Sequence, residues 1–120
     1  MSLAACSKKE QTELFKNHLE YFDLVGLKNY DKYQLILIVD SQGCESCKDS
    51  AMQLIRLLET EYVVKIIDLG KNTNQLQIEN ALIDSSRIYY SFPFSFDGLT
   101  VVDLSSQELH YPLFESTPIL

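Results

Sequence analysis

Residues 35–47, LILIVDSQGCESC, place a hydrophobic run shortly before a pair of cysteines. The run Leu35–Val39 is continuous and rich in β-branched residues, as in a strand that helices cover on both faces. Residues 41–43, Ser-Gln-Gly, end the run, and an apolar stripe at helical spacing begins at Cys47. The stretch therefore predicts a buried strand that leads into a helix, with the two cysteines at the junction.

Cys44 and Cys47 carry the chemistry that such a junction favours. A thiol attacks as its thiolate, and the free N–H groups and dipole of a helix N-terminus stabilise that anion. We expect Cys44 to lie there, exposed and nucleophilic. Cys47 follows one turn along the apolar stripe, sheltered but close enough to resolve a mixed disulfide. This context predicts a redox-active dithiol.

Helix and strand patterns alternate on both sides of this stretch. Strands that alternate with helices indicate βαβ units and a parallel sheet. Gly26 suits the end of the first helix. The predicted elements, in chain order, are a helix at 10–25, strands and helices alternating at 35–39, 46–60, 62–69 and about 75–84, and possible strands at 88–92, 99–104 and 109–114.

Length, composition and charge fit one globular domain. The chain has 120 residues, 46% of them hydrophobic, which is enough for an independent core. A net charge of −7 without a basic cluster argues against a nucleic-acid surface. No apolar run approaches the ~20 residues that a membrane-spanning helix needs.

Residues 33–70 resemble the thioredoxin-like family in their strand, C-x-x-C motif, helix and second strand, and within it the extracytoplasmic TlpA/ResA-type reductases. The rest of the chain matches loosely. The resemblance implies an α/β fold with a central mixed sheet flanked by helices. It also implies a thiol–disulfide oxidoreductase that exchanges disulfides with a protein partner. Cys44 then matches the nucleophile and Cys47 the resolving thiol, with no cofactor besides their disulfide.

The residues around the cysteines match the family in part. Glu45 matches, since some of these reductases have Glu after the first cysteine. Gly43 replaces the common aromatic residue, and Ser46 replaces the proline inside the motif. The connection from the strand to the cysteines is short, so Asp40 matches the buried acid of some members only in part. These departures leave the reduction potential and the substrate open.

Two charged residues are expected to tune the dithiol. Glu45 places a negative charge beside the Cys44 thiolate and disfavours the anion. Lys48 acts in the opposite sense but lies a turn away. We therefore expect a reductant rather than a strong oxidant.

The resemblance also implies a cis-proline opposite the cysteines, and two prolines compete for this place. Thr117-Pro118 has the local pattern of the family but leaves no room for the two strands that normally follow. Phe92-Pro93 leaves that room, although its aromatic neighbours are less typical. Both Pro93 and Pro118 remain candidates.

The first residues are similar to a lipoprotein signal. Leu3-Ala4-Ala5-Cys6 precedes Ser-Lys-Lys, as at the end of a bacterial signal whose cysteine receives lipid. This interpretation makes Cys6 a lipidation site and places the domain outside the cytoplasm, anchored to a bacterial membrane in the periplasm. Residues 1–9 are then an N-terminal remnant, and residues 10–120 form the thioredoxin-like domain. The alternative is a stray surface cysteine.

Metal and structural interpretations of the cysteines stay open beside the redox one. A zinc site needs two more ligands, and the only histidines are His18 and His110. His18 is expected to be a packed or surface residue. Cys44, Cys47 and His110 suit copper, so a non-catalytic or copper-binding module on the same fold is the alternative function. A structural disulfide is the plainest alternative.

Overall fold

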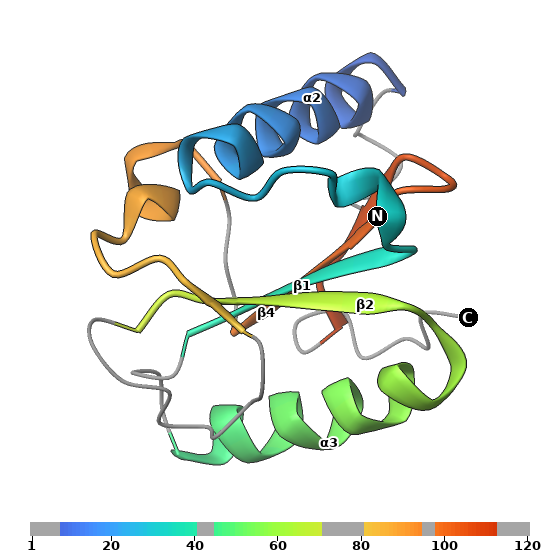
Figure 1. Cartoon of the computed structure of the whole chain (residues 1–120), viewed down its shortest axis with the longest axis vertical. Coiled ribbons are helices and arrows are strands. Elements are labelled where there is room, and N and C mark those ends of the chain that lie inside the picture. The colour runs from blue at the N-terminus through green and yellow to red at the C-terminus, as the bar shows by residue number, and fades with distance from the viewer. Residues whose placement is uncertain (1–7, 41–44, 71–80, 95–97, 113–120) are drawn as a thin grey trace.

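The computed structural model describes residues 8–40, 45–70, 81–94 and 98–112. Figure 1 shows a central sheet with one long helix on each face. The elements are the helices α2 (Lys8–Leu24) and α3 (Glu45–Glu61), the 3₁₀ helices η1 (Tyr30–Lys32) and η2 (Ile88–Ser91), and the strands β1 (Leu35–Val39), β2 (Val64–Asp68), β3 (Leu82–Ile83), β4 (Leu99–Asp103) and β5 (Glu108–His110).

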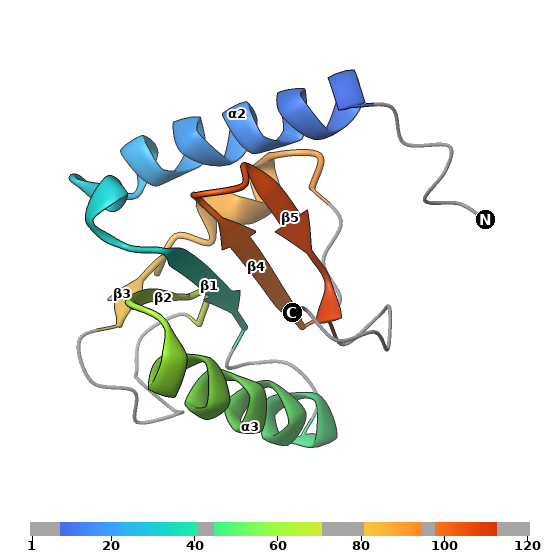
Figure 2. The ribbon, with the colours of Figure 1, turned by 90° about the vertical axis from the view of Figure 1, so that its right-hand side faces the viewer.

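The sheet has five strands in the order β3-β2-β1-β4-β5, so β1 is central. β1 pairs with β2 in parallel, and β2 pairs with β3 in parallel. On the other side, β4 runs antiparallel to β1 and β5 runs antiparallel to β4 (Figure 2). This arrangement confirms the predicted α/β class and the mixed sheet between helices.

β1 is buried on both faces, as the continuous hydrophobic run predicted. Ile36 and Ile38 pack in the core under α2, and Leu35, Leu37 and Val39 pack in the core under α3. Each of the five is at most 2% exposed. Burying such a side chain contributes about 1.5–3 kcal/mol, so the central strand is a main source of the fold's stability.

Both long helices lie close to their predicted positions. α3 begins at Glu45, one residue before the expected start, and buries Ala51, Ile55 and Leu58 on one stripe. α2 begins at Lys8, two residues before its expected start. Within the described ranges, no helix is both long and apolar enough to span a bilayer.

α2 ends in a Schellman motif at Gly26, as expected. The Gly26 N–H donates to the carbonyl of Asp23 at 3.2 Å, and the Leu27 N–H donates to the carbonyl of Phe22 at 2.9 Å. Gly26 has φ +85°, a left-handed conformation that glycine adopts without steric cost. Leu27 and Phe22 then share one core, which fixes the direction of the chain toward β1.

The prediction of a helix at about 75–84 is wrong for its C-terminal residues. Leu82 and Ile83 form β3 and pair with Ile67 and Asp68 of β2. Because β2 would otherwise be an edge strand, its open backbone groups favour an extended partner over a last helical turn. Residues 71–80 lie outside the described residues.

The strand predicted at 88–92 is also wrong, because residues Ile88–Ser91 form the 3₁₀ helix η2. The Asp84 carboxylate accepts the backbone N–H groups of Ile88 and Tyr89 at 2.9 and 3.0 Å and so stabilises a tight turn. Arg87 before η2 has φ +53°, which extended backbone excludes. The strand predicted at 99–104 is confirmed as β4, and the one at 109–114 is the shorter β5.

Candidate functional site

The C-x-x-C motif stands where β1 leads into α3. Glu45 is the first residue of α3, and Cys47 and Lys48 follow in its first turn. The backbone of these three residues is described, whereas their side chains are not. Cys44 precedes the helix directly in sequence and lies outside the described residues, as do Cys6 and Pro118. The predicted strand-to-helix context of the motif is therefore confirmed.

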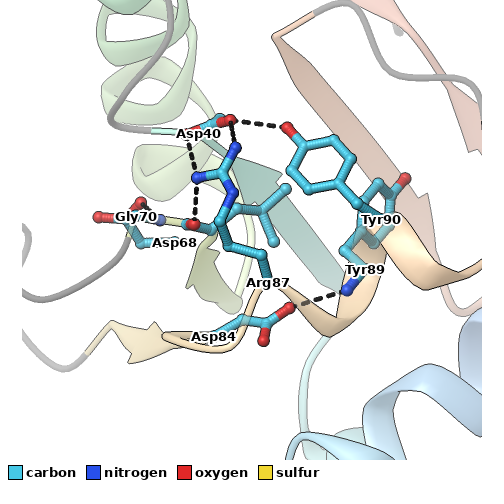
Figure 3. Close-up of polar contacts among 8 residues, drawn as sticks. Asp40, Asp68, Gly70, Asp84, Arg87, Tyr89 and Tyr90 are labelled. Atoms are coloured by element: carbon cyan, nitrogen blue, oxygen red, sulfur yellow. Dashed lines mark hydrogen bonds and ion pairs between the residues drawn. The ribbon is translucent and has the colours of Figure 1, made fainter.

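Three acidic residues gather at the same edge of the sheet. Asp40 follows β1, Asp68 ends β2 and Asp84 follows β3. Because these three strands are parallel, their carboxyl ends meet at one edge (Figure 3). In open α/β sheets this edge is the usual place for binding sites.

Asp40 is buried and held by two side chains from the segment after β3. It is 8% exposed. Arg87 Nη2 donates to Asp40 Oδ2 at 2.8 Å, and Nη1 lies 3.4 Å from Oδ1. The Tyr90 hydroxyl donates to the same Oδ2 at 2.6 Å. The pKa of Arg87 is raised because its guanidinium donates to Asp40, so the guanidinium stays charged.

Arg87, the residue before η2, contacts the ends of both β1 and β2. Its Nη1 donates to the Leu69 carbonyl at 2.8 Å, just beyond the end of β2. Its guanidinium carbon lies 4.7 Å from the centre of the Tyr90 ring, a cation–π contact. Burial of Tyr90, followed by its hydrogen bond to Asp40, raises the pKa of the phenol, which therefore remains a donor.

Asp84 connects η2 to helix α2 through hydrogen bonds. Besides the two N–H groups of η2, its carboxylate accepts the hydroxyl of Tyr21 in α2 at 2.8 Å. Burial, and then the nearby Asp84 charge, raises the pKa of Tyr21. The Asp84 N–H donates to the carbonyl of Asp68 at 2.8 Å. One carboxylate thus links β3, η2 and α2.

Asp68, the last residue of β2, is not a solvated strand end. Its side chain is fully buried, and Oδ1 accepts the N–H of Gly70 at 2.8 Å. The reason is its neighbours, because β1 and β3 flank the end of β2 and shield it from water.

His18 is packed, as expected, and is not a surface residue. Its ring is 0% exposed and stacks on Phe94, with ring centres 3.9 Å apart. Nδ1 lies 2.8 Å from the Leu14 carbonyl, which accepts only, so Nδ1 carries the proton. Nε2 then accepts from the Tyr89 hydroxyl at 3.3 Å. Burial lowers the pKa of His18 from 6.5 to about 4, although the bond to Leu14 acts the other way.

We expect the buried, neutral His18 to make folding pH-dependent. The unfolded chain binds a proton at this ring near pH 6.5, and the folded chain does so only near pH 4. The stabilisation is therefore complete above about pH 6.5 and is lost as the pH falls toward 4, by about 3 kcal/mol in all. Urea unfolding at several pH values measures it, with His18→Gln as control. Parallel stability curves for the two proteins between pH 6.5 and 4.5 would contradict the expectation.

His110, the proposed imidazole ligand for copper, lies on the edge strand β5. Its Nε2 is 3.8 Å from a carboxylate oxygen of Glu108. It pairs across the ladder with Val101, which belongs to the core under α3. In the described ranges, no three His, Cys, Asp or Glu side chains lie close enough to hold a metal ion. Cys44 is not among those residues.

The peptide bond between Phe92 and Pro93 is trans, since no cis bond occurs in the described part of the chain. Phe92 has φ −93° and ψ 154°, the extended conformation that a following proline favours. Trans is also the cheaper isomer for an X–Pro bond. Pro93 therefore lacks the cis peptide bond that the resemblance implies. Pro118 lies outside the described residues and stays a candidate.

No known protein family, curated protein or solved structure matches this chain significantly. Any function of this protein therefore depends on the chemistry of its site.

The sequence pointed to the cysteines but missed Arg87 and Tyr90. Arg87 interacts with Asp40, 47 residues earlier, and no local pattern indicates a partner at that separation. One local signal was available at Asp84. Aspartate often accepts backbone N–H groups in turns, so Asp84 indicates the tight turn at η2.

Proposed function

We propose that this protein is a thiol–disulfide oxidoreductase of thioredoxin-like fold, with Cys44 as nucleophile and Cys47 as resolving thiol. The observation that carries the proposal is the start of α3 at Glu45, directly after Cys44 and shortly after the central strand. A helix N-terminus stabilises a thiolate through its dipole and free N–H groups.

The sheet supports the finer assignment of the fold. β1, α3 and β2 form a parallel βαβ unit, and a helix covers each face. β4 and β5 then follow Pro93 and extend the other side of β1, as do the two strands expected after the family's proline. The trans bond before Pro93 is a departure from the family, in addition to Gly43 and Ser46 in the motif.

In the proposed reaction the Cys44 thiolate attacks one sulfur of a substrate disulfide. A mixed disulfide forms, and the other substrate sulfur leaves as a thiolate that takes up a proton. Cys47, deprotonated, then attacks Cys44 and releases the second substrate thiol. The substrate disulfide gains two electrons, and the two cysteines lose two electrons as they form a disulfide. The reverse sequence oxidises a substrate dithiol.

The proposed setting is extracytoplasmic. A lipid on Cys6 would anchor the domain to a bacterial membrane, where disulfide chemistry is common. The proposed partner is another protein that carries a thiol pair or a disulfide, and no nucleic acid is involved.

A redox titration of the Cys44–Cys47 pair against glutathione or dithiothreitol buffers tests the function. A reversible disulfide with a defined potential supports it. Tight Cu(I) binding without such a disulfide supports the alternative, a copper-binding module with Cys44, Cys47 and His110 as ligands.

Replacement of Glu45 by Gln is expected to lower the pKa of the Cys44 thiol. The reason is that Glu45, the first residue of α3, directly follows Cys44 in the sequence, and a neighbouring negative charge disfavours a thiolate. The couple should become more oxidising, because a more stable thiolate favours the reduced form. The rate of alkylation by iodoacetamide against pH measures the pKa. Glu59→Gln, at the exposed far end of α3, is the control. An unchanged pKa in Glu45→Gln rules the effect out.

A further inference from the structure

β5 is the last strand on one side of the sheet. Among the described strands, none pairs with its outer edge, since the order β3-β2-β1-β4-β5 ends there (Figure 2). The backbone N–H and C=O groups along such an edge are a template for a further strand, and many proteins block it with lysine, proline or an inward-pointing charge. Glu108–His110 contains no lysine and no proline, and its core-facing side chain is Leu109, which is 7% exposed.

The two ionisable side chains of β5 lie together on the face opposite Leu109. Side chains alternate along a strand, so Glu108 and His110 share one face. His110 pairs with Val101, a residue of the core under α3, which places both side chains on the α3 side of the sheet. Their side chains are 61% and 26% exposed, with His110 Nε2 3.8 Å from Glu108 Oε1. The edge thus presents an acid and a base two residues apart.

Glu108 has an unfavourable neighbour on its inner side. Asp103 of β4 stands opposite Glu108 in the ladder, and like charges in that position are destabilising. A positive group on the open side of Glu108 would offset this repulsion. His110 has the apolar Val101 on its own inner side, so a negative group on its open side meets no competing charge there.

A second copy of the same edge supplies both groups at once. When two β5 strands run antiparallel about a two-fold axis at Leu109, Glu108 of each copy lies opposite His110 of the other. A shift of two residues would place Glu108 opposite Glu108 or His110 opposite His110, which like charges disfavour. A shift of one residue would turn Leu109 of one copy toward the charged face of the other. Charge and side-chain alternation therefore select a single register.

We propose that β5 is a self-association surface, through which two copies of this chain pair edge to edge with reciprocal Glu108–His110 contacts. Such a contact is isologous, because both copies contribute the same residues. Leu109 of both copies lies on the α2 side, so the core under α2 continues across the junction. Because β5 has three residues, the contact is small, and we expect a dimer that dissociates on dilution. This inference is independent of the proposed function.

Analytical ultracentrifugation over a range of protein concentrations tests the proposal. The buffer is at about pH 6, where histidine side chains are partly protonated, and contains dithiothreitol so that cysteines do not cross-link the copies. The parent should show a reversible monomer–dimer equilibrium. In Glu108→Lys and in His110→Glu, each dimer would hold two like-charge pairs related by symmetry. We therefore expect the dissociation constant of each variant to rise about tenfold.

A mixture of the two variants tests the register itself. The lysine of Glu108→Lys then faces the glutamate of His110→Glu, and the remaining Glu108 and His110 face each other. A heterodimer should form about as tightly as the parent dimer, and the double variant Glu108→Lys/His110→Glu should also dimerise. Glu59→Lys makes the same charge change at an exposed position of α3 and is expected to keep the parent dissociation constant. Circular dichroism checks that each variant folds, and the double variant decides the case if a single variant does not fold.

A parent protein that stays monomeric at the highest concentration reached would overturn the inference. A dimer that persists unchanged in both single variants would place the contact elsewhere and overturn it as well. The same holds if the mixture of variants stays monomeric, because the residues at 108 and 110 would then not face each other. None of these outcomes bears on the oxidoreductase proposal, which the redox titration tests.

Discussion

Replacement of Cys44 by Ser is expected to reduce disulfide reductase activity to the uncatalysed rate. A serine hydroxyl does not ionise near neutral pH, so the attack on the substrate sulfur is lost. The measurement is reduction of a peptide disulfide by the pre-reduced protein, followed by separation of oxidised and reduced peptide. Since α3 begins after residue 44, the substitution changes the reacting atom and leaves the helix sequence as it is.

Cys47→Ser and Cys6→Ser are the matched controls for this result. Cys47→Ser keeps the nucleophile but not the resolving thiol, so a mixed disulfide with the peptide should accumulate and be visible by mass spectrometry. Cys6→Ser should retain the parent rate, because the proposed role of Cys6 is lipid attachment. A Cys44→Ser protein that reduces the peptide as fast as the parent would show that the nucleophile is assigned wrongly.

Replacement of Asp84 by Ala is expected to lower the free energy of unfolding by about 3–5 kcal/mol. The buried carboxylate accepts the Tyr21 hydroxyl and the N–H groups of Ile88 and Tyr89. Without it these three donors stay in the interior without an acceptor. Such a loss is a large part of the roughly 5–15 kcal/mol that keeps a typical domain folded. Urea unfolding followed by circular dichroism gives the value.

Asp103→Ala is a matched control for the Asp84 variant. Asp103 Oδ1 also accepts two N–H groups and one hydroxyl, from Ser105 and Ser106, but in an exposed turn. Partial burial would raise the pKa of Asp103, yet these hydrogen bonds outweigh it and keep the pKa low. Because water replaces the lost acceptor there, we expect a cost of about 1 kcal/mol or less. Equal losses in the two variants would mean that burial of Asp84 is not the cause.

Sequence patterns determined the parts of this fold that depend on nearby residues. The bounds of β1 were predicted correctly from one hydrophobic run, and α3 within one residue at each end from one apolar stripe. Gly26 marked the end of α2 because only a left-handed residue suits that turn. Each of these features is encoded within a few neighbouring residues or at helical spacing, so a short window of sequence contains the information. The same holds for the placement of the C-x-x-C motif between a strand and a helix.

Only the tertiary structure decided how distant segments meet. Leu82 and Ile83 became a strand because β2 offered an open edge, and Asp68 became buried because two strands flank it. Arg87 and Asp40 pair across 47 residues because β1, β2 and β3 are parallel and end at one edge. The strand order that creates such contacts depends on the packing free energy of the whole chain. For this reason the sequence predicted the dithiol motif, whereas the charged cluster of Asp40, Arg87 and Tyr90 at the end of the central strand appeared only in the tertiary structure.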